Sequence, residues 1–316
     1  MDNDKNNIVG IYYDRKPMGG YLYNKKNTQY YVEAMKNINE YLGSRGLDAV
    51  FLMGQDSYIG QGQFGNYWRM DNETGELHKI ESTIQPAIIY DKGHISFYDG
   101  CFTIFNHPDL ARLGRNKWSQ YGLFAKFMPE TYIADDETSL EKCLHDIAGN
   151  MVVIKPLDQN SGNGIFIGKK TSAVGQKEFP AIVQEYHETS SGVPGVASGR
   201  HDIRLIIMNG KICVAAVREP KGDKLLANTH QGGSIRFFDP QLLPDVVLTM
   251  AKAVDEKLKK YGNRLYSSDF LFDGKKWYLI EINDRPGLPA LYQDDESGVI
   301  KNFYDTLTQN IIKWSK

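Results

Sequence analysis

The sequence has little cysteine, no long apolar run and no excess of charge of either sign. Its 316 residues include only Cys101, Cys143 and Cys213, far apart and without metal-ligand spacing, which favours a reducing compartment over a disulfide framework. No apolar stretch approaches the roughly 20 residues that a membrane-spanning helix needs. With 37 basic and 39 acidic residues the formal net charge is -2, so bulk electrostatics predicts neither a nucleic-acid nor a membrane partner.

Two motifs are also missing. The first seven residues, MDNDKNN, are polar and acidic and lead into a short strand, so we expect no signal peptide. Together with the scarce cysteines, this predicts a cytoplasmic protein. No G-x-G-x-x-G follows the first expected strand, which argues against a dinucleotide-binding dehydrogenase.

The first third of the chain has the pattern of an α/β domain. Residues 8–14 form an apolar run typical of a buried strand, residues 28–42 carry apolar side chains at helical spacing, and residues 47–53 predict the next strand. A hairpin is expected over residues 67–80 and a further strand over 86–91. Strand, helix, strand is the order of a βαβ unit, so we predict an α/β domain here.

After about Asn106 the pattern changes to short helices, a strand at 131–134 and a helix at 139–148. Thr138 and Glu141 have the spacing of a capping box for that helix.

Lys155 interrupts the apolar strand predicted over residues 151–157. A buried lysine without a partner is costly, so it needs an anion or a carboxylate nearby. The stretch Gln159–Gly168 follows at once, with glycines at 162, 164 and 168 whose backbone N–H groups can surround phosphates. A glycine-rich loop alone is usually only a turn; the lysine before it favours a phosphate site.

Asn209-Gly210 predicts a tight hairpin between residues 201–208 and 211–218. Asp202 and Arg204 share one strand face because alternate side chains point to the same side. An ideal two-residue turn pairs Arg218 with His201 and puts Arg218 on the other face, whereas a bulge would bring it to the face of Asp202. The pattern leaves both arrangements open. Residues 244–261 predict an amphipathic helix.

The stretch 266–283 predicts a second hairpin in which Glu281 and Asn283 share a face. Asp269 joins that face only in some registers. A two-residue turn puts it on the opposite side, while a three-residue connection over 273–275 pairs Asp269 with Leu279 and brings it beside Glu281. Oxygen ligands of this kind suit Mg²⁺. The alternative is a solvated polar face of an edge hairpin.

Several segments occur in one fixed order: Lys155 with its glycine loop, QEYHE, DIRLIIMNGKICVAAV, NTHQGG and SSDFLFDGKKWYLIEINDRPG. This combination resembles the ATP-grasp carboxylate–amine ligases, most closely the branch of glutathione synthetase and the ribosomal-protein glutamate ligase (RimK-like). The resemblance covers roughly residues 106–316. The N-terminal third is compatible with the family's leading α/β domain but carries no diagnostic motif.

The resemblance implies a mixed α/β (α+β) protein with the ATP-grasp fold. Such a fold has an N-terminal α/β (pre-ATP-grasp) domain, a central lid subdomain and a C-terminal antiparallel-sheet subdomain, with the nucleotide bound between them. We expect the N-terminal, substrate-side domain over residues 1–105 and the central subdomain, with the glycine-rich loop, over 106–187. The metal- and phosphate-binding C-terminal subdomain is expected over 188–316.

The resemblance also implies roles for individual residues. The nucleotide would be bound by Lys117, Lys155, Gln159, Ser161, Gly162, Gly164, Gln184, Glu185, Tyr186, Glu188 and Asp202. Among these, residues 184–186 would form the hinge that meets adenine, and Glu188 would contact the ribose. Catalytic roles would fall to Arg204, Arg218 and Asn228, and the Mg²⁺ ligands would be Asp269, Glu281 and Asn283.

The implied activity is an ATP- and Mg²⁺-dependent ligase, with Mn²⁺ as a substitute metal. It would join a carboxylate to an amine through an acyl phosphate, on amino-acid or peptide substrates. One alternative is a phosphotransferase that stops at the phosphorylated product; another is a nucleotide-binding regulatory protein without turnover. A requirement for an amine in ADP formation separates the first two. The family often forms dimers or tetramers, so a homo-oligomer is allowed.

Two positions depart from the family pattern. Relatives often carry an arginine where this chain has Leu226, and a small residue with Ser-Pro where this chain has Asp284-Arg285-Pro286. We hypothesise that Arg285 binds a substrate carboxylate or phosphate by a bidentate contact. The alternative is a surface arginine without a binding role. His230 is a second candidate for contact with the substrate, on the amine.

Overall fold

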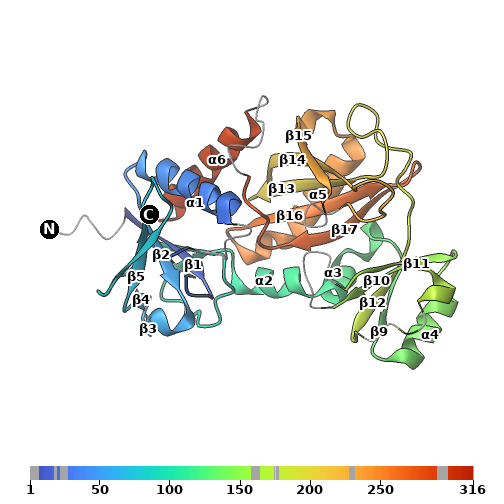
Figure 1. Ribbon diagram of the computed structural model, residues 1–316, viewed down its shortest axis with the longest axis horizontal. Coiled ribbons are helices and arrows are strands. Elements are labelled where there is room, and N and C mark those ends of the chain that lie inside the picture. The colour runs from blue at the N-terminus through green and yellow to red at the C-terminus, as the bar shows by residue number, and fades with distance from the viewer. Residues whose placement is uncertain are drawn as a thin grey trace. The chain divides into compact units, whose positions relative to one another are not determined.

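The structure is a computed structural model that describes residues 7–17, 20–21, 28–157, 164–173, 175, 178–227, 232–289 and 298–315. The chain divides into two compact units (Figure 1). Unit 1 consists of Met1–Ala111, Tyr261–Leu265 and Arg285–Lys316, and unit 2 of Arg112–Lys260 and Tyr266–Asp284. The three-domain division expected from the resemblance stays a prediction.

Unit 1 contains a six-stranded sheet with the order β6-β5-β2-β1-β7-β8. Its strands are β1 (Ile8–Tyr13), β2 (Asp48–Met53), β5 (Tyr67–Met70), β6 (Leu77–Ile80), β7 (Ile88–Asp91) and β8 (Thr103–Phe105). The strands β2, β1, β7 and β8 run parallel, and β5 and β6 form the predicted antiparallel hairpin. A separate two-stranded sheet joins β3 (Tyr58–Gly60) and β4 (Gln63–Phe64).

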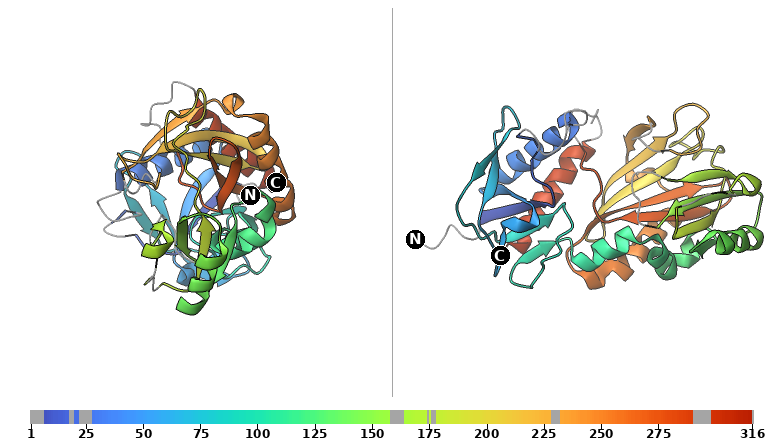
Figure 2. Two further views of the ribbon diagram at one scale, coloured as in Figure 1. Left: turned by 90° about the vertical axis from the view of Figure 1, so that its right-hand side faces the viewer. Right: turned by 60° about the horizontal axis from the view of Figure 1, so that its bottom comes forward.

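The helices α1 (Thr28–Gly43) and α6 (Val299–Trp314) pack side by side in unit 1, as Figure 2 also shows. Tyr304 on α6 donates a hydrogen bond to the carbonyl of Ala34 on α1 at 3.4 Å. A core cluster of buried side chains in unit 1 includes Tyr12, Val50, Leu52, Phe64 and Ile89. Burial on both faces explains why β1 and β2 read as continuous apolar runs.

Unit 2 contains two antiparallel sheets, in the orders β11-β10-β12-β9 and β15-β14-β13-β16-β17. The first sheet comprises β9 (Thr131–Ala134), β10 (Met151–Pro156), β11 (Phe166–Lys169) and β12 (Ala181–Glu185). The second comprises β13 (Asp202–Met208), β14 (Lys211–Glu219), β15 (Ser234–Phe238), β16 (Leu265–Phe272) and β17 (Trp277–Asn283). The remaining α-helices are α2 (Pro108–Arg115), α3 (Lys117–Phe124), α4 (Glu137–Asp146) and α5 (Asp245–Leu258).

One predicted helix start is wrong. The capping box of α4 is formed by Asp136 and Ser139, not by Thr138 and Glu141. Asp136 Oδ1 accepts the Ser139 N–H at 2.8 Å, and Ser139 Oγ accepts the Asp136 N–H at 2.9 Å. An aspartate caps as well as a threonine and lies two residues earlier, so the helix begins sooner than predicted.

The hairpin of β13 and β14 contains the bulge that the sequence left open. Asn209 and Gly210 have φ values of 47° and 85°, as the predicted tight turn requires. The register then shifts between Ile206 and Ile207, so that Arg218 lies opposite Asp202 rather than His201. Arg218 and Asp202 therefore share a face.

The hairpin of β16 and β17 corrects the predicted register. Phe272 pairs with Trp277, so the connection has four residues rather than three. A further register shift between Asp269 and Phe270 places Asp269 directly opposite Glu281 instead of Leu279. Asp269 therefore shares the face of Glu281 and Asn283, which the sequence left open, although its pairing differs from both connections considered. Among helices of the described ranges, none is long and apolar enough to cross a bilayer.

Candidate active site

The three predicted metal ligands lie on adjacent strands of unit 2. Asp269 on β16 is opposite Glu281 on β17, and Asn283 follows two residues later on the same face. Asn283 Nδ2 donates a hydrogen bond to Glu281 Oε1 at 3.1 Å. Within the described ranges no group of three His, Cys, Asp or Glu side chains could hold a metal. The predicted set differs, because it has two carboxylates and one amide.

Two arginines, Arg204 on β13 and Arg218 on β14, bind the carboxylate of Asp269. Arg204 Nε and Nη2 donate to its Oδ1 and Oδ2 at 2.8 and 2.6 Å. Arg218 Nη2 donates to Oδ2 at 2.8 Å, and the same guanidinium binds Asp202 at 2.6 and 2.8 Å. Both carboxylate oxygens of Asp269 thus face cations, and Asp269 itself is only 2% exposed.

The charges of this network set the ionisation of its two aspartates in opposite directions. Burial disfavours the charged form of Asp269, but Arg204 and Arg218 outweigh it and lower the pKa. For Asp202, burial and the nearby charge of Asp269 raise the pKa against the lowering by Arg218. Of the two aspartates, Asp202 therefore takes up a proton more readily than Asp269.

Lys155 points its ammonium into the same region from β10. Its Nζ donates to Gln184 Oε1 at 2.9 Å, and Gln184 Nε2 donates to Thr131 Oγ1 at 2.9 Å. Burial lowers the pKa of Lys155 to about 8, with Lys117 acting in the same direction and Glu281 and Asp269 opposing it. Lys155 is buried with a neutral amide as its acceptor, which is an environment that an anion would improve.

Lys117 begins α3 and is also buried. Its Nζ donates to the carbonyls of Pro156 and Leu157 at 3.2 and 3.4 Å. Those carbonyls directly follow Lys155, so both lysines lie at the end of β10, where the predicted phosphate loop begins. Gly164, with φ of +67°, is exposed at the far end of that loop. Gln159, Ser161 and Gly162, and Asn228 and His230 in the later loop, lie outside the described residues.

The contact of residues 184–186 with adenine stays a prediction, and the Gln184 side chain accepts a hydrogen bond from Lys155. Tyr186 donates its hydroxyl to Glu188 Oε2 at 3.2 Å. Arg200 binds both Glu188 oxygens at 2.8 and 2.9 Å, and hydrogen bonding to Arg200 lowers the Glu188 pKa to about 2. Glu185 lies 3.2 Å from the His187 ring. The Glu188 carboxylate predicted to contact ribose is thus fixed by an arginine that the sequence did not single out.

Arg285 lies in unit 1, where its guanidinium is held at the end of β7. Nη2 donates to Asp91 Oδ2 at 2.6 Å, Nε donates to the Asp91 carbonyl at 3.3 Å, and Nη1 contacts the His94 ring. The Arg285 side chain is only 10% exposed. The alternative of a surface arginine is therefore wrong. Asp91 could have been identified from the sequence, because it ends an apolar parallel strand, where α/β folds place ligand-binding groups.

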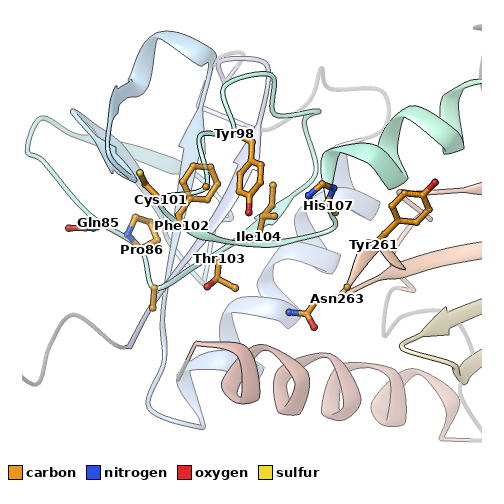
Figure 3. A pocket seen from close by; sticks show the side chains of 13 residues that line it. Gln85, Pro86, Tyr98, Cys101, Phe102, Thr103, Ile104, His107, Tyr261 and Asn263 are labelled. Carbon is orange, nitrogen blue, oxygen red and sulfur yellow. The ribbon is translucent and has the colours of Figure 1, made fainter. Parts of the chain in front are cut away.

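The described part of unit 1 also has a pocket of about 770 Å³ at the start of β7 and β8 (Figure 3). Its lining includes Pro86, Tyr98, Thr103, His107 and Tyr261, and it contains none of the predicted site residues. The Tyr98 and His107 rings lie edge to face with centroids 5.5 Å apart. This pocket is distinct from the carboxyl ends of the parallel strands.

Comparison with known proteins gives a family match. The model of the family "Prokaryotic glutathione synthetase, ATP-grasp domain" matches residues 119–285, which is more than half of the chain. A probable alpha-L-glutamate ligase of Halorhodospira halophila is 27% identical over 188 residues, covering 56% of this chain and 58% of that relative. The chain therefore spans less than two thirds of that relative's length.

Solved structures agree on the fold. D-alanyl-alanine synthetase A from Vibrio cholerae matches with a TM-score of 0.61 and 12% identity, over 97% of this chain and 99% of that one. A RimK domain ATP-grasp protein from Sphaerobacter thermophilus matches with a TM-score of 0.57 and 14% identity, over 98% and 99%. The predicted mixed α/β ATP-grasp fold is confirmed.

Proposed function

This chain belongs to the family of the prokaryotic glutathione synthetase ATP-grasp domain, and from that premise we propose that it is an ATP-dependent carboxylate–amine ligase. It forms an amide bond between an amino-acid or peptide carboxylate and an amine. The observation that carries the proposal is the convergence in unit 2 of an oxygen-rich strand face, two arginines and the buried Lys155.

The donor set fits a hard divalent cation. Asp269 and Glu281 supply carboxylate oxygens and Asn283 an amide oxygen, all on one face, and such cations take oxygen ligands. Mg²⁺, or Mn²⁺ in its place, would be held by these three residues and would neutralise charge on the transferring phosphate. Asp269 Oδ1 accepts one arginine hydrogen bond and Oδ2 accepts two, so Oδ1 keeps a lone pair that a cation could use.

The basic residues supply positioning and charge. Lys155 and Lys117 hold the nucleotide phosphates, and a phosphate keeps the Lys155 ammonium protonated despite its burial. Arg204 and Arg218, preoriented by Asp269 and Asp202, offset the negative charge that develops on the phosphoryl group during transfer.

The covalent chemistry takes place between the substrates. The substrate carboxylate attacks the γ-phosphate of ATP and releases ADP, and the resulting acyl phosphate is captured by the amine, which expels phosphate. No side-chain nucleophile is needed. The loop predicted around residues 159–164 closes over the phosphates and excludes water, which would otherwise hydrolyse the acyl phosphate. Asn228 and His230 act near the reacting centre, and Arg285 binds a substrate carboxylate or phosphate.

The substrate class is taken from chemistry and from the relatives. The Halorhodospira halophila relative is named a probable glutamate ligase, which supports an amino-acid substrate with a side-chain carboxylate. The test is Mg²⁺-dependent ADP release over amino acids and dipeptides supplied in pairs, with mass spectrometry of the product. ADP release that needs both partners and yields an amide supports the proposal. Release with a carboxylate alone, leaving a stable phosphorylated product, would indicate a phosphotransferase instead.

A further inference from the structure

Gln120, on α3, hydrogen-bonds to both backbone groups of Ile282. Its Oε1 accepts the Ile282 N–H at 2.8 Å, and its Nε2 donates to the Ile282 carbonyl at 3.0 Å. The side chain is 1% exposed, so these bonds form away from water. Strand β17 is the outermost strand of its sheet. The Gln120 amide thus makes the two backbone hydrogen bonds to Ile282 that a residue of a further neighbouring strand would make.

The position of Ile282 gives this contact its significance. Ile282 lies between Glu281 and Asn283, two of the predicted metal ligands. Because its N–H and C=O point to Gln120, those of Glu281 and Asn283 point to the opposite side, toward β16. Their partners there are Asp269 and Ser267. The backbone that carries both ligands is therefore bonded on its two edges.

Gln120 is itself held firmly. Its Nε2 also lies within hydrogen-bonding distance of the Leu113 and Gly114 carbonyls at the end of α2, at 3.1 and 3.0 Å. Carbonyls in the last turn of a helix have no partner within the helix, so this amide supplies one. The side chain connects α2, α3 and β17, and its donor and acceptor atoms are assigned by these partners.

We infer that Gln120 is a positioning residue for the metal site, which fixes the strand segment that presents Glu281 and Asn283. The inference rests on the proposed function, because it needs those residues to bind a metal. Outer contacts that orient ligands commonly affect metal affinity by about 10- to 100-fold. A residue that only stabilised the fold would not affect metal binding selectively.

The test uses the full chain, Mn²⁺ as the metal and a non-hydrolysable ATP analogue. Electron paramagnetic resonance of free Mn²⁺ measures metal affinity in the nucleotide complex, and calorimetry in EDTA measures nucleotide affinity without metal. Gln120→Met keeps the side-chain length but loses every hydrogen bond. We expect about tenfold weaker Mn²⁺ binding with unchanged metal-free nucleotide affinity. Gln241→Met, at an exposed glutamine of unit 2, is the matched control and should leave both affinities unchanged.

Gln120→Glu provides a second variant. Burial beside three carbonyl oxygens keeps its carboxyl group protonated, so it still accepts the Ile282 N–H but donates to only one carbonyl, and a smaller loss of Mn²⁺ affinity is expected. If Gln120→Met does not fold, the Mn²⁺ affinity and the metal-free nucleotide affinity of Gln120→Glu are compared with those of the wild type instead. If the folded variants bind Mn²⁺ as tightly as the wild type, the inference about Gln120 is overturned and the proposed function is not affected. A wild-type protein without metal-dependent nucleotide binding overturns the proposed function, and the inference with it.

Discussion

Arg204 and Asp269 form a two-pronged ion pair, with Nε to Oδ1 at 2.8 Å and Nη2 to Oδ2 at 2.6 Å. The same carboxylate receives Arg218. The carboxylate of a predicted metal ligand is thus paired with two arginines. Metal binding at this position has to compete with them, and phosphates that attract the arginines would help it.

Replacing Asp269 should therefore affect stability as well as activity. Asp269→Ala leaves the buried Arg218 and the half-buried Arg204 each short of a partner, and breaking a buried pair in this way costs about 3–5 kcal/mol of unfolding free energy. Asp269→Asn keeps the shape and should lose Mg²⁺-dependent nucleotide binding. Urea unfolding and calorimetry measure the two effects. Lys16→Ala, which removes an exposed pair with Asp56, is the control and should change stability little. An Asp269→Ala protein as stable as the wild type would contradict the network.

The buried Lys155 predicts a pH dependence of nucleotide binding. Its pKa is about 8 in the free protein, and bound phosphate raises it, so above pH 8 binding requires the uptake of a proton. ATP affinity should accordingly fall as the pH rises through 8. Calorimetry at pH 8.5 in buffers of different ionisation enthalpy measures the proton uptake. Lys155→Met should bind ATP weakly and abolish this uptake; the same uptake in that variant would exclude Lys155 as its source.

The same residue makes a stability prediction of defined sign. The folded pKa of about 8 is below the ordinary lysine value of 10.5, so between these values the unfolded chain binds more protons. The Lys155 contribution to the unfolding free energy of the ligand-free protein therefore rises with pH across this window. Urea unfolding at pH 8 and pH 10 should show the rise in the wild type relative to Lys155→Met. An identical pH slope in the two proteins would contradict the depressed pKa.

Glu188 and Arg200 allow the predicted ribose contact to be tested apart from their ion pair. If Glu188 binds ribose, Glu188→Gln raises the KM for ATP but not for a dideoxyribose analogue. Arg200→Ala removes the ion pair while leaving the carboxylate, so it serves as the control. Equal KM changes with both nucleotides would show that Glu188 acts only through Arg200.

Arg285 should affect one substrate rather than the nucleotide. Arg285→Ala is expected to raise the KM for the carboxylate or phosphate-bearing substrate and to spare ATP affinity. Arg69→Ala removes an exposed arginine of unit 1, paired with Asp48 at 2.7 and 2.6 Å, and provides a matched control. Steady-state kinetics with each substrate varied in turn decides the matter. An unchanged KM would leave Arg285 with only its structural contact to Asp91.

Two helix glycines give a paired test of packing. A Cβ on Gly114 would lie 2.5 Å from Asp284 Oδ1 and 2.9 Å from Asp284 Cβ, whereas a Cβ on Gly122 meets nothing within 4 Å. Gly114→Ala should destabilise the protein by about 1–3 kcal/mol. Gly122→Ala should stabilise it by about 0.4–1 kcal/mol through lower unfolded-chain entropy. Chemical denaturation of both variants measures these opposite signs; equal effects would contradict the packing.

The sequence predicted the strands that carry the site but not their register. The face shared by Asp269 and Glu281 depends on a four-residue connection and a bulge, and each of these changes the parity of the pairing. Relative to the three-residue connection the two changes cancel, so the face considered for that connection is present although the pairing differs. For Arg218, a single bulge decided the face, and alternation along a strand contains no information on where a bulge lies.

Contacts between distant parts of the chain could not be predicted. Gln120 and Ile282 are separated by 162 residues, and Arg285 and Asp91 by 194. A polar residue in a short helix gives no sign of the backbone that it will bind. The role of Lys117 came from the family resemblance alone, whereas strand position and alternation also indicated Lys155, Glu281 and Asn283, and Asp269 in one of the registers considered. Those roles stay predictions.

The most direct test of the proposed chemistry follows a single oxygen atom. With a substrate pair identified by ADP release, the carboxylate is labelled with ¹⁸O and the phosphate product is examined by mass spectrometry. Attack of the carboxylate on the γ-phosphate predicts one ¹⁸O atom in each phosphate released with the amide. Unlabelled phosphate formed together with amide product would contradict an acyl phosphate and the account built on it.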